Sequence, residues 1–183
     1  MFIFRRISSD DSNLNFITEN KAFNDLAPDK TLKTYVEQDI IEGGNFYTYI
    51  LLKESEDKKS ELLGLLRYKL VNIYDFRQEL NNFEIIEKKQ VEFLKWFSGR
   101  TFSIIYLSRI GVSKEYQEKN ISQIIYNFFE FIIKDRFENV LIYVKILKNL
   151  IKIIGPSYIV IAESYDEKWG NFYLAMKIIK SEK

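Results

Sequence analysis

The hydrophobic positions along this chain follow two different periods, and together they predict a mixed α/β fold. Stretches in which Tyr, Ile, Val and Leu alternate with polar residues, or run together, are typical of strands. They predict strands, in chain order, at residues 2–7, 46–53, 62–73, 102–112, 140–146, 158–162 and 171–179. The charged stretch at 54–61 lies between two of these strands and predicts the solvated tip of a long hairpin.

Apolar residues spaced three or four positions apart predict helices between these strands. The clearest helix follows Val112, with one wide apolar face formed by Ile121, Ile124, Ile125, Phe128, Phe129 and Ile132. Other helical segments are predicted at 33–41, which Gly43 and Gly44 stop, within 76–97, and at 147–154. The fold class is therefore a mixed, mostly antiparallel sheet flanked by helices.

Length and composition indicate one globular domain. The chain has 183 residues, of which 46% are hydrophobic, and this is enough to bury a core. It has two prolines and no Gly/Ser-rich or Pro-rich stretch, so no linker divides it and residues 1–183 are expected to form a single domain. No apolar run approaches the length of a membrane span, and the N-terminal residues do not form a signal peptide, so a cytoplasmic protein is expected.

Charge and residue types exclude several kinds of chemistry. The net charge of +1 gives no general attraction for nucleic acid or for an acidic membrane. The chain has no Cys and no His, which removes disulfides, thiolate nucleophiles and imidazole bases, and we expect no metal site. Catalysis would have to use carboxylates, Tyr, Ser, Lys or backbone amides.

Residues 111–133, GVSKEYQEKNISQIIYNFFEFII, hold the most informative pattern: a strand, a polar loop, and then a helix. The first amides of a helix lack intrahelical acceptors and lie at the positive end of the helix dipole, so they favour an anion. Phosphate-binding loops use glycines at such places, where this chain has Asn120 and Ser122. Asn tolerates the left-handed backbone region and Ser is small, so a phosphate cradle is compatible with the sequence.

This stretch resembles the signature of the GNAT superfamily of acyl-CoA-dependent N-acetyltransferases. The signature is a strand ending in Val, four residues, and then Q/R-x-x-G-x-G/A at the start of a helix. Here Val112 is followed by SKEY and by Gln117 to Ser122 in QEKNIS, which reproduces the spacing. The length and element order also fit, and YVEQDIIEGGNFYTYILLKE with LLGLLRY resembles the corresponding region of GNATs related to toxin–antitoxin pairs.

The resemblance implies acetyl-CoA as co-substrate and an amine as acceptor. The strand at Leu107–Val112 would separate from its neighbour and hold the pantetheine arm, the loop amides would hold the pyrophosphate, and Lys119 could add positive charge. Direct attack of the amine on the thioester needs no protein nucleophile. The implied CoA-binding residues are Ile110, Val112, Gln117, Glu118, Lys119, Asn120, Ile121 and Ser122.

The departures from the family pattern concern the acid and the glycines. With Gly155-Pro156 aligned on the family's Gly-Phe pair, Ile151 stands where relatives carry the Tyr that protonates the CoA thiolate, and Val144 where they carry Asn. The catalytic residues are therefore unassigned. The candidates are Tyr143, Tyr158 and Tyr165 as acids and Glu115, Glu118 and Glu163 as bases, while Trp96 and Trp169 could line a substrate mouth.

Three alternatives stay open. Residues 113–134 could form one plain helix capped by Ser113, with no phosphate loop. The chain could be a catalytically silent GNAT module that binds a CoA-like ligand or a protein partner, as the missing Tyr and glycines suggest. It could also be a toxin-like acetyltransferase, although acting on tRNA would call for a basic patch. The acceptor, the acyl chain and the oligomeric state, a homodimer included, are not determined by the sequence.

Overall fold

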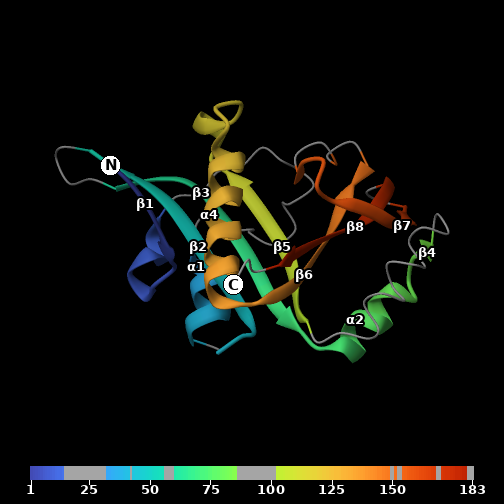
Figure 1. Ribbon diagram of the computed structural model, residues 1–183. Coiled ribbons are helices and arrows are strands. Elements are labelled where there is room, and N and C mark those ends of the chain that lie inside the picture. The colour runs from blue at the N-terminus through green and yellow to red at the C-terminus, as the bar shows by residue number, and fades with distance from the viewer. Residues whose placement is uncertain are drawn as a thin grey trace. The chain divides into compact units, whose positions relative to one another are not determined.

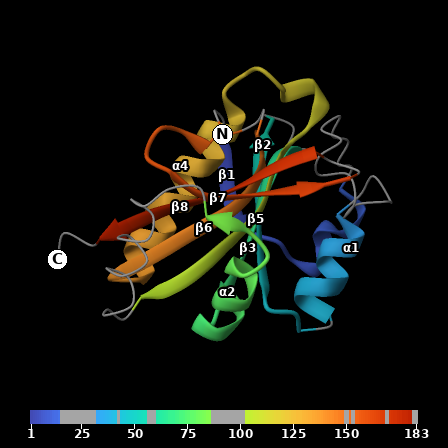
Figure 2. The same ribbon diagram turned by 90° about the vertical axis from the view of Figure 1, so that its right-hand side faces the viewer.

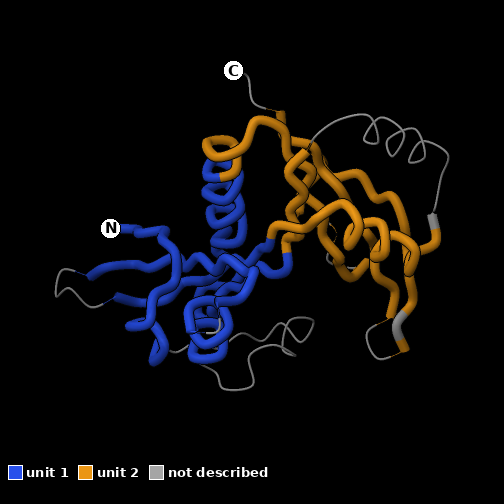
Figure 3. Tube along the Cα trace, turned by 90° about the horizontal axis from the view of Figure 1, so that it is seen from below, with its two compact units in different colours: residues 1–69, 108–132 blue, residues 70–107, 133–183 orange. Residues whose placement is uncertain are grey.

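The computed structural model divides into two compact units, shown in Figure 3. It describes residues 1–14, 32–41, 43–55, 60–85, 102–148, 151, 154–167 and 170–180. Unit 1 comprises Met1–Lys69 and Ser108–Ile132, and unit 2 comprises Leu70–Leu107 and Ile133–Lys183. Strand β5 (Ser103–Val112) and helix α4 (Ile121–Arg136) each contribute residues to both units.

Unit 1 contains an antiparallel meander of β1 (Phe2–Arg6), β2 (Phe46–Glu54) and β3 (Ser60–Val71, of which residues up to 69 belong to this unit). The last residues of β5 follow β3 in the strand order. Central β2 and β3 carry long buried runs, as expected for strands covered on both faces. A register shift between Leu51 and Leu52 interrupts the β2–β3 ladder.

Helices cover unit 1 on the two faces of this meander. Part of α4 packs on one face, where Phe128 stacks on Phe4 at 5.2 Å and Phe129 lies 5.4 Å from Tyr68 between ring centroids. Figure 1 shows α4 crossing in front of β2 and β3. Because side chains alternate along a strand, the neighbouring positions face the other way. There they form a core with α1 (Lys33–Val36) that includes Ile7, Leu32, Tyr35, Val36, Ile50, Leu52, Leu62 and Leu65.

Unit 2 has the strand order β5-β6-β8-β7-β4, in which β6 is Asn139–Leu147, β7 is Ile159–Asp166, β8 is Gly170–Lys180 and β4 is Glu84–Ile85. The β5–β6 pair is parallel, and β6–β8, β7–β8 and β4–β7 are antiparallel. Figure 2 shows β6 and β8 side by side. Helix α2 (Ile73–Leu80) contributes Phe76 to the core of this unit, with Ile104, Leu141, Tyr143, Ile161, Ala162, Leu174 and Met176.

Most of the predicted elements are confirmed, and one is corrected. The seven predicted strands are present, and the helical segment at 33–41 is α1 followed by a π-helical turn, η3 (Glu37–Ile41). The helical reading of 76–97 is wrong for Glu84 and Ile85, which pair with β7 as β4. Parts of the predicted helices at 86–97 and 147–154, and both Trp96 and Trp169, lie outside the described residues. In the described ranges, no helix is long and apolar enough to cross a membrane.

A buried ionic cluster lies inside unit 1. Asp39, in η3, is 4% exposed and pairs with Arg67 of β3 at 2.6 Å. The Asp39 carboxylate also accepts a hydrogen bond from the Thr48 hydroxyl. Arg67 lies over the Phe46 ring at 4.0 Å and the Tyr35 ring at 5.1 Å. Burial is costly for each charge alone, so the pair and its rings form one mutually dependent group.

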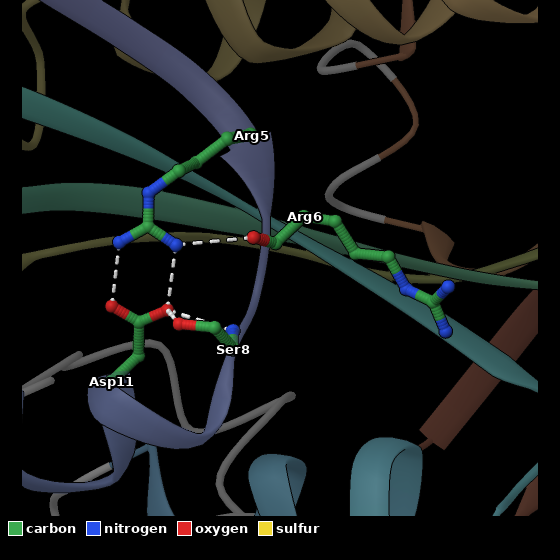
Figure 4. A network of polar contacts seen from close by, with 4 residues as sticks. All are labelled: Arg5, Arg6, Ser8 and Asp11. Atoms are coloured by element: carbon green, nitrogen blue, oxygen red, sulfur yellow. Dashed lines mark hydrogen bonds and ion pairs between the residues drawn. The ribbon is translucent and has the colours of Figure 1, made fainter.

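A second polar network fixes the chain as it leaves β1 (Figure 4). Arg5 donates two hydrogen bonds of 2.7 Å to the Asp11 carboxylate, one to each oxygen. The same carboxylate accepts the Ser8 amide at 2.8 Å and the Ser8 hydroxyl at 2.9 Å. Asp11 belongs to the 3-10 helix η1 (Ser9–Asn13), so this network ties η1 to β1.

Asp11→Asn is expected to destabilise the protein at neutral pH and to lose that effect in acid. Burial alone would raise the pKa of Asp11, but the hydrogen bonds from Arg5 and Ser8 outweigh it and lower the pKa below its ordinary value. A lowered pKa stabilises the fold above the unfolded-state pKa, and this contribution is lost as the pH falls through the folded-state value. Because Arg5 is partly exposed, we expect a cost of about 1–2 kcal/mol at pH 7.

Urea unfolding of both proteins at pH 7 and at successively lower pH, from about pH 4 downward, measures this difference. The difference should shrink as the pH falls. Asp10→Asn is the matched control, since Asp10 is exposed in the same turn and should change stability little at any pH. A difference for Asp11→Asn that stays constant with pH would contradict the assignment.

Candidate functional site

The loop from β5 to α4 has two non-glycine residues in the left-handed backbone region. β5 ends at Val112, a single 3-10 turn η4 covers Lys114–Tyr116, and α4 begins at Ile121. Between them Glu118 has φ 65° and Asn120 has φ 59°. The alternative of one plain helix over 113–134 is therefore wrong, because these values break the helix before Ile121.

The backbone conformation of this loop presents amide groups at the start of α4. The first helical bond there is from the Ile124 amide to the Asn120 carbonyl, at 3.2 Å, so the amides of residues 121–123 precede the helical ladder. Positive φ at 118 and 120, separated by one residue without it, is the alternation that makes successive N–H groups converge in an anion-binding nest. The 16-residue α4 adds the positive end of its dipole.

Hydrogen bonds to β3 fix the beginning of this loop. The Ser113 amide donates to the Leu63 carbonyl at 2.8 Å, and the Ser113 hydroxyl donates to the Leu62 carbonyl at 2.6 Å. Gly64 allows the close approach, because a Cβ at that position would lie 2.5 Å from the Gly111 carbonyl oxygen. Ser113 therefore ties the loop to β3 rather than capping a helix at that point.

Two polar residues of the predicted CoA set, Gln117 and Lys119, have defined side-chain contacts. The Gln117 amide donates back to the Val112 carbonyl at 3.5 Å. Lys119 donates to the Glu115 carbonyl at 2.9 Å and lies 4.8 Å from the centre of the Tyr116 ring. Lys119 is thus directed toward the preceding turn, so the positive character at the start of α4 comes from backbone amides.

The other predicted CoA residues differ in exposure. Glu118 and Asn120 are exposed, Ser122 is half-buried, and Ile121 is 6% exposed, so the Ile121 side chain packs in the core and only its amide is available to a ligand. On β5, Ile110 and Val112 are half-buried and alternate with buried Arg109 and Gly111. They therefore share one face of the strand.

A cavity of 420 Å³ lies beside η4 in unit 1. Its charged lining residues are Glu61, Lys114 and Glu115, so negative charge predominates. Tyr116 also lines it, and a hydrogen bond to Glu61, together with burial, raises the pKa of Tyr116 to about 12. Two carboxylates disfavour a phosphate in this cavity, so the amides before α4 are the better candidate for an anion site.

The ladder between β5 and β6 ends well before either strand does. Its parallel register covers Ser103–Tyr106 against Val140–Tyr143, with Tyr106 opposite Tyr143 as the last pair. β5 continues to Val112 and β6 continues to Leu147. In this register, Leu107, the last β5 residue of unit 2, has no partner in β6.

A polar cluster surrounds that last pair. Tyr143 is fully buried, and its hydroxyl donates to the Glu79 carboxylate at 2.6 Å. Lys145 forms an ion pair with the other oxygen of Glu79, whose side chain is 21% exposed. Burial, followed by the hydrogen bond to Glu79, raises the pKa of Tyr143 far above its ordinary value, and burial raises that of Tyr106 to about 12. Both phenols are therefore neutral at physiological pH.

Among the acids and bases considered from the sequence, Tyr143 lies in a polar cluster with Glu79 and Lys145. Tyr165 is 71% exposed, and Tyr158 is buried with Lys177 6.0 Å from its ring centre. Glu115, Glu118 and Glu163 are exposed. Val144 is buried and Ile151 is half-buried, at the two positions aligned with polar family residues.

Glu79 was not singled out by the sequence. It lies in α2 among other charged residues and looks like a solvated helix position. Its partner Tyr143 is 64 residues away, so no local pattern joins the two. The one available signal was weak: Glu79 is three residues after Phe76, which places the two on the same side of a helix.

Comparison with known structures gives the fold. No protein-family model matches the sequence, and no curated protein matches it significantly. Arabidopsis thaliana NAA60 in complex with acetyl-CoA superposes with a TM-score of 0.59 at 16% identity, over 98% of this chain and 99% of that one. A structure described as a GNAT-family acetyltransferase from Desulfovibrio desulfuricans gives 0.56 at 11%, over 98% and 99%. The chain has the GNAT fold.

A structure described as AtaTR bound with AcCoA superposes with a TM-score of 0.53 at 13% identity, over 95% of this chain and 92% of that one. The predicted GNAT-type sheet, mixed and mostly antiparallel with flanking helices, is therefore confirmed. At these identities the likeness establishes the GNAT fold, whereas the reaction that a protein catalyses depends on the residues of its own site.

Proposed function

We propose that this protein is an acyl-CoA-dependent N-acetyltransferase that transfers an acetyl or other short acyl group to an amine. The observation that carries the proposal is the pair of positive φ angles at Glu118 and Asn120 directly before α4. Holding non-glycine residues in this region costs about 1–2 kcal/mol each, which a plain connection would avoid. The same conformation gathers backbone amides, which is what a pyrophosphate needs.

The residues present fit acyl-CoA along its length. The amides at 118–122 suit the pyrophosphate, and the face of β5 that carries Ile110 and Val112 suits the largely apolar pantetheine arm. Acetyl-CoA is bound by proteins of this fold, including NAA60.

The proposed chemistry uses Glu79 as the base. The amine nitrogen attacks the thioester carbonyl, a C–N bond forms, the C–S bond breaks, and CoA leaves as thiolate. Glu79, which is partly exposed, takes the proton that the amine must lose. Tyr143 keeps its own proton and holds the carboxylate in place. A thiol pKa of about 8.5 lets the thiolate leave without a dedicated acid.

CoA is expected to raise the melting temperature of the protein, since a ligand of the folded state stabilises it by mass action. Pantetheine lacks the pyrophosphate and should give a much smaller shift. The measurement is thermal unfolding with each compound, together with titration calorimetry. Saturating CoA without a shift or measurable heat would contradict the phosphate loop.

Two variants test the loop itself. Asn120→Gly should retain stability and CoA affinity, because glycine adopts the observed φ of 59° without strain. Asn127→Gly is the matched control at an exposed position inside α4. There we expect a loss of about 0.5–1 kcal/mol, from the lower helix propensity of glycine and from the lost hydrogen bond with the Gln123 side chain. Equal losses in the two variants would show that residue 120 is helical and would remove the basis of the proposal.

Acyl transfer is tested with acetyl-CoA and a panel of polyamines, peptide α-amines, lysine peptides and aminoacyl-tRNA, by release of free CoA. Transfer to any of them supports the enzyme. CoA binding without transfer to any acceptor would favour the silent module that binds a CoA-like ligand. Selective acetylation of aminoacyl-tRNA would favour the toxin-like enzyme.

A further inference from the structure

Four aromatic side chains form an exposed patch on unit 1. They are Phe2 and Phe4 of β1 and Phe128 and Phe131 of α4, and we call them the β1–α4 aromatic patch. Phe131 is 72% exposed, Phe2 is 54% exposed and Phe128 is 39% exposed. Figure 1 shows the two elements that carry them. Large aromatics in such numbers are unusual on a free surface.

The members of the patch are neighbours. Phe2 and Phe4 are two positions apart on a strand and point to the same face. Phe4 and Phe128 stack with their ring centroids 5.2 Å apart and the ring planes inclined by 14°. Phe128 and Phe131 are three positions apart on a helix, which places them on one side of it. The patch therefore runs continuously from the edge of the sheet onto α4.

β1 also offers an edge for strand pairing. It is the first strand in the order, and among the described strands its neighbour is β2. The Glu54 amide donates to the Met1 carbonyl, and the Ile7 amide donates to the Thr48 carbonyl, both at 2.9 Å. Odd-numbered residues of β1 thus direct their backbone groups to β2. The N–H and C=O groups of Phe2, Phe4 and Arg6 point to the opposite edge, where the Arg6 carbonyl also accepts a hydrogen bond from the Arg5 guanidinium at 3.1 Å.

The size of the patch suits a protein contact. Taking about 200 Å² for a fully exposed Phe, the exposed fractions of Phe2, Phe128 and Phe131 give about 330 Å² of apolar surface. This lies within the range of about 300–600 Å² for the largest patch on a typical monomer, a patch that is often functional. A specific interface buries about 800 Å² on each partner, and pairing of β1 with another strand would supply much of the remainder.

We propose that a second copy of this chain covers the patch, through antiparallel pairing of β1 with β1 about a two-fold axis at Phe4. The partner must present both an open strand edge and an aromatic surface, and this chain presents both together. The register puts Phe4 opposite its own copy and Phe2 opposite Arg6 of the second copy, a favourable cation–aromatic pair. The net charge of +1 leaves little repulsion between copies.

The proposal is independent of the acetyltransferase chemistry. The molar mass of the protein in solution tests it. Sedimentation equilibrium up to about 100 μM should show a dimer of the 21.9 kDa chain, since interfaces of this size span micromolar and tighter affinities. Phe131→Glu should weaken the dimer at least about tenfold, because it places a charge in the patch. Tyr74→Glu, at an equally exposed aromatic outside the patch, should leave the dissociation constant unchanged.

A mixing experiment separates the interface from a folding defect. Phe131→Glu and Phe131→Lys should each be monomeric alone, with wild-type circular dichroism. They should form a mixed dimer when combined, because Phe131 lies one helical turn from Phe128, which stacks on Phe4 at the proposed axis, and the opposite charges attract. A monomeric wild-type protein at every concentration would overturn the proposal. So would a dimer that Phe131→Glu leaves intact, or a failure of the two charged variants to associate.

Discussion

Asp39→Asn is expected to be among the most destabilising single substitutions in this protein. It leaves the guanidinium of Arg67, which is 2% exposed, without its counter-charge inside unit 1. Removing one partner of a buried ion pair typically costs about 3–5 kcal/mol, a large share of the stability of a domain. Equilibrium unfolding in urea measures the change directly.

Glu37→Gln is the matched control for this prediction. Glu37 lies in the same π-helical turn and pairs with Lys33 at 3.9 Å, but both side chains are well exposed. Its substitution should therefore change stability by less than about 1 kcal/mol. If Asp39→Asn lowered the free energy of unfolding no more than Glu37→Gln does, a group other than Asp39 would have to balance the charge of Arg67.

Glu79→Gln is expected to lower kcat for acyl transfer by about 10²–10⁴-fold, the usual effect of losing a general base. Gln keeps the size of the side chain and can still accept the Tyr143 hydroxyl, so CoA affinity and folding should change little. The measurement is the release of free CoA at saturating acetyl-CoA and acceptor, with calorimetry to confirm unchanged CoA binding.

Two further variants show whether the loss of kcat is specific to the Glu79 carboxylate. Tyr143→Phe removes the hydroxyl that orients Glu79, so it should lower kcat less than Glu79→Gln does, and raising the pH should not restore it. Glu163→Gln changes an exposed carboxylate on β7 and should leave kcat unchanged. A Glu79→Gln enzyme that kept its kcat would show that another group or water takes the proton.

Patterns among neighbouring residues were sufficient to predict most of the strands and part of the candidate site. Strand periodicity is a property of neighbouring residues, so β2, β3, β5 and β6 could be located from their composition. Asn120 was predicted to accept a left-handed conformation because its own side chain tolerates it, and its φ of 59° confirms this. Glu118 has no such tendency, and its φ of 65° is imposed by its surroundings.

Features that depend on distant partners could not be predicted. β4 exists because Glu84 and Ile85 pair with β7, whereas the spacing around Phe83 favoured a helix. Glu79 contacts Tyr143 and Lys145 on β6, and these contacts give it its role. The sequence of α2 indicates neither contact. The end of the β5–β6 ladder depends likewise on the register of two strands and not on the residues of either one.

The interleaving of the two units constrains how this protein can be made. Unit 1 needs residues 108–132 as well as 1–69, and unit 2 begins at residue 70 and is completed only near the C-terminus. A ribosome that has synthesised the first 107 residues has therefore completed neither unit. The edge of β3 that faces β5 stays unpaired until the rest of β5 has been synthesised. Non-local pairing of this kind is slow to form and exposes strand edges meanwhile. Nascent chains of this length should accordingly depend on chaperones, and fragments cut at residue 107 should aggregate.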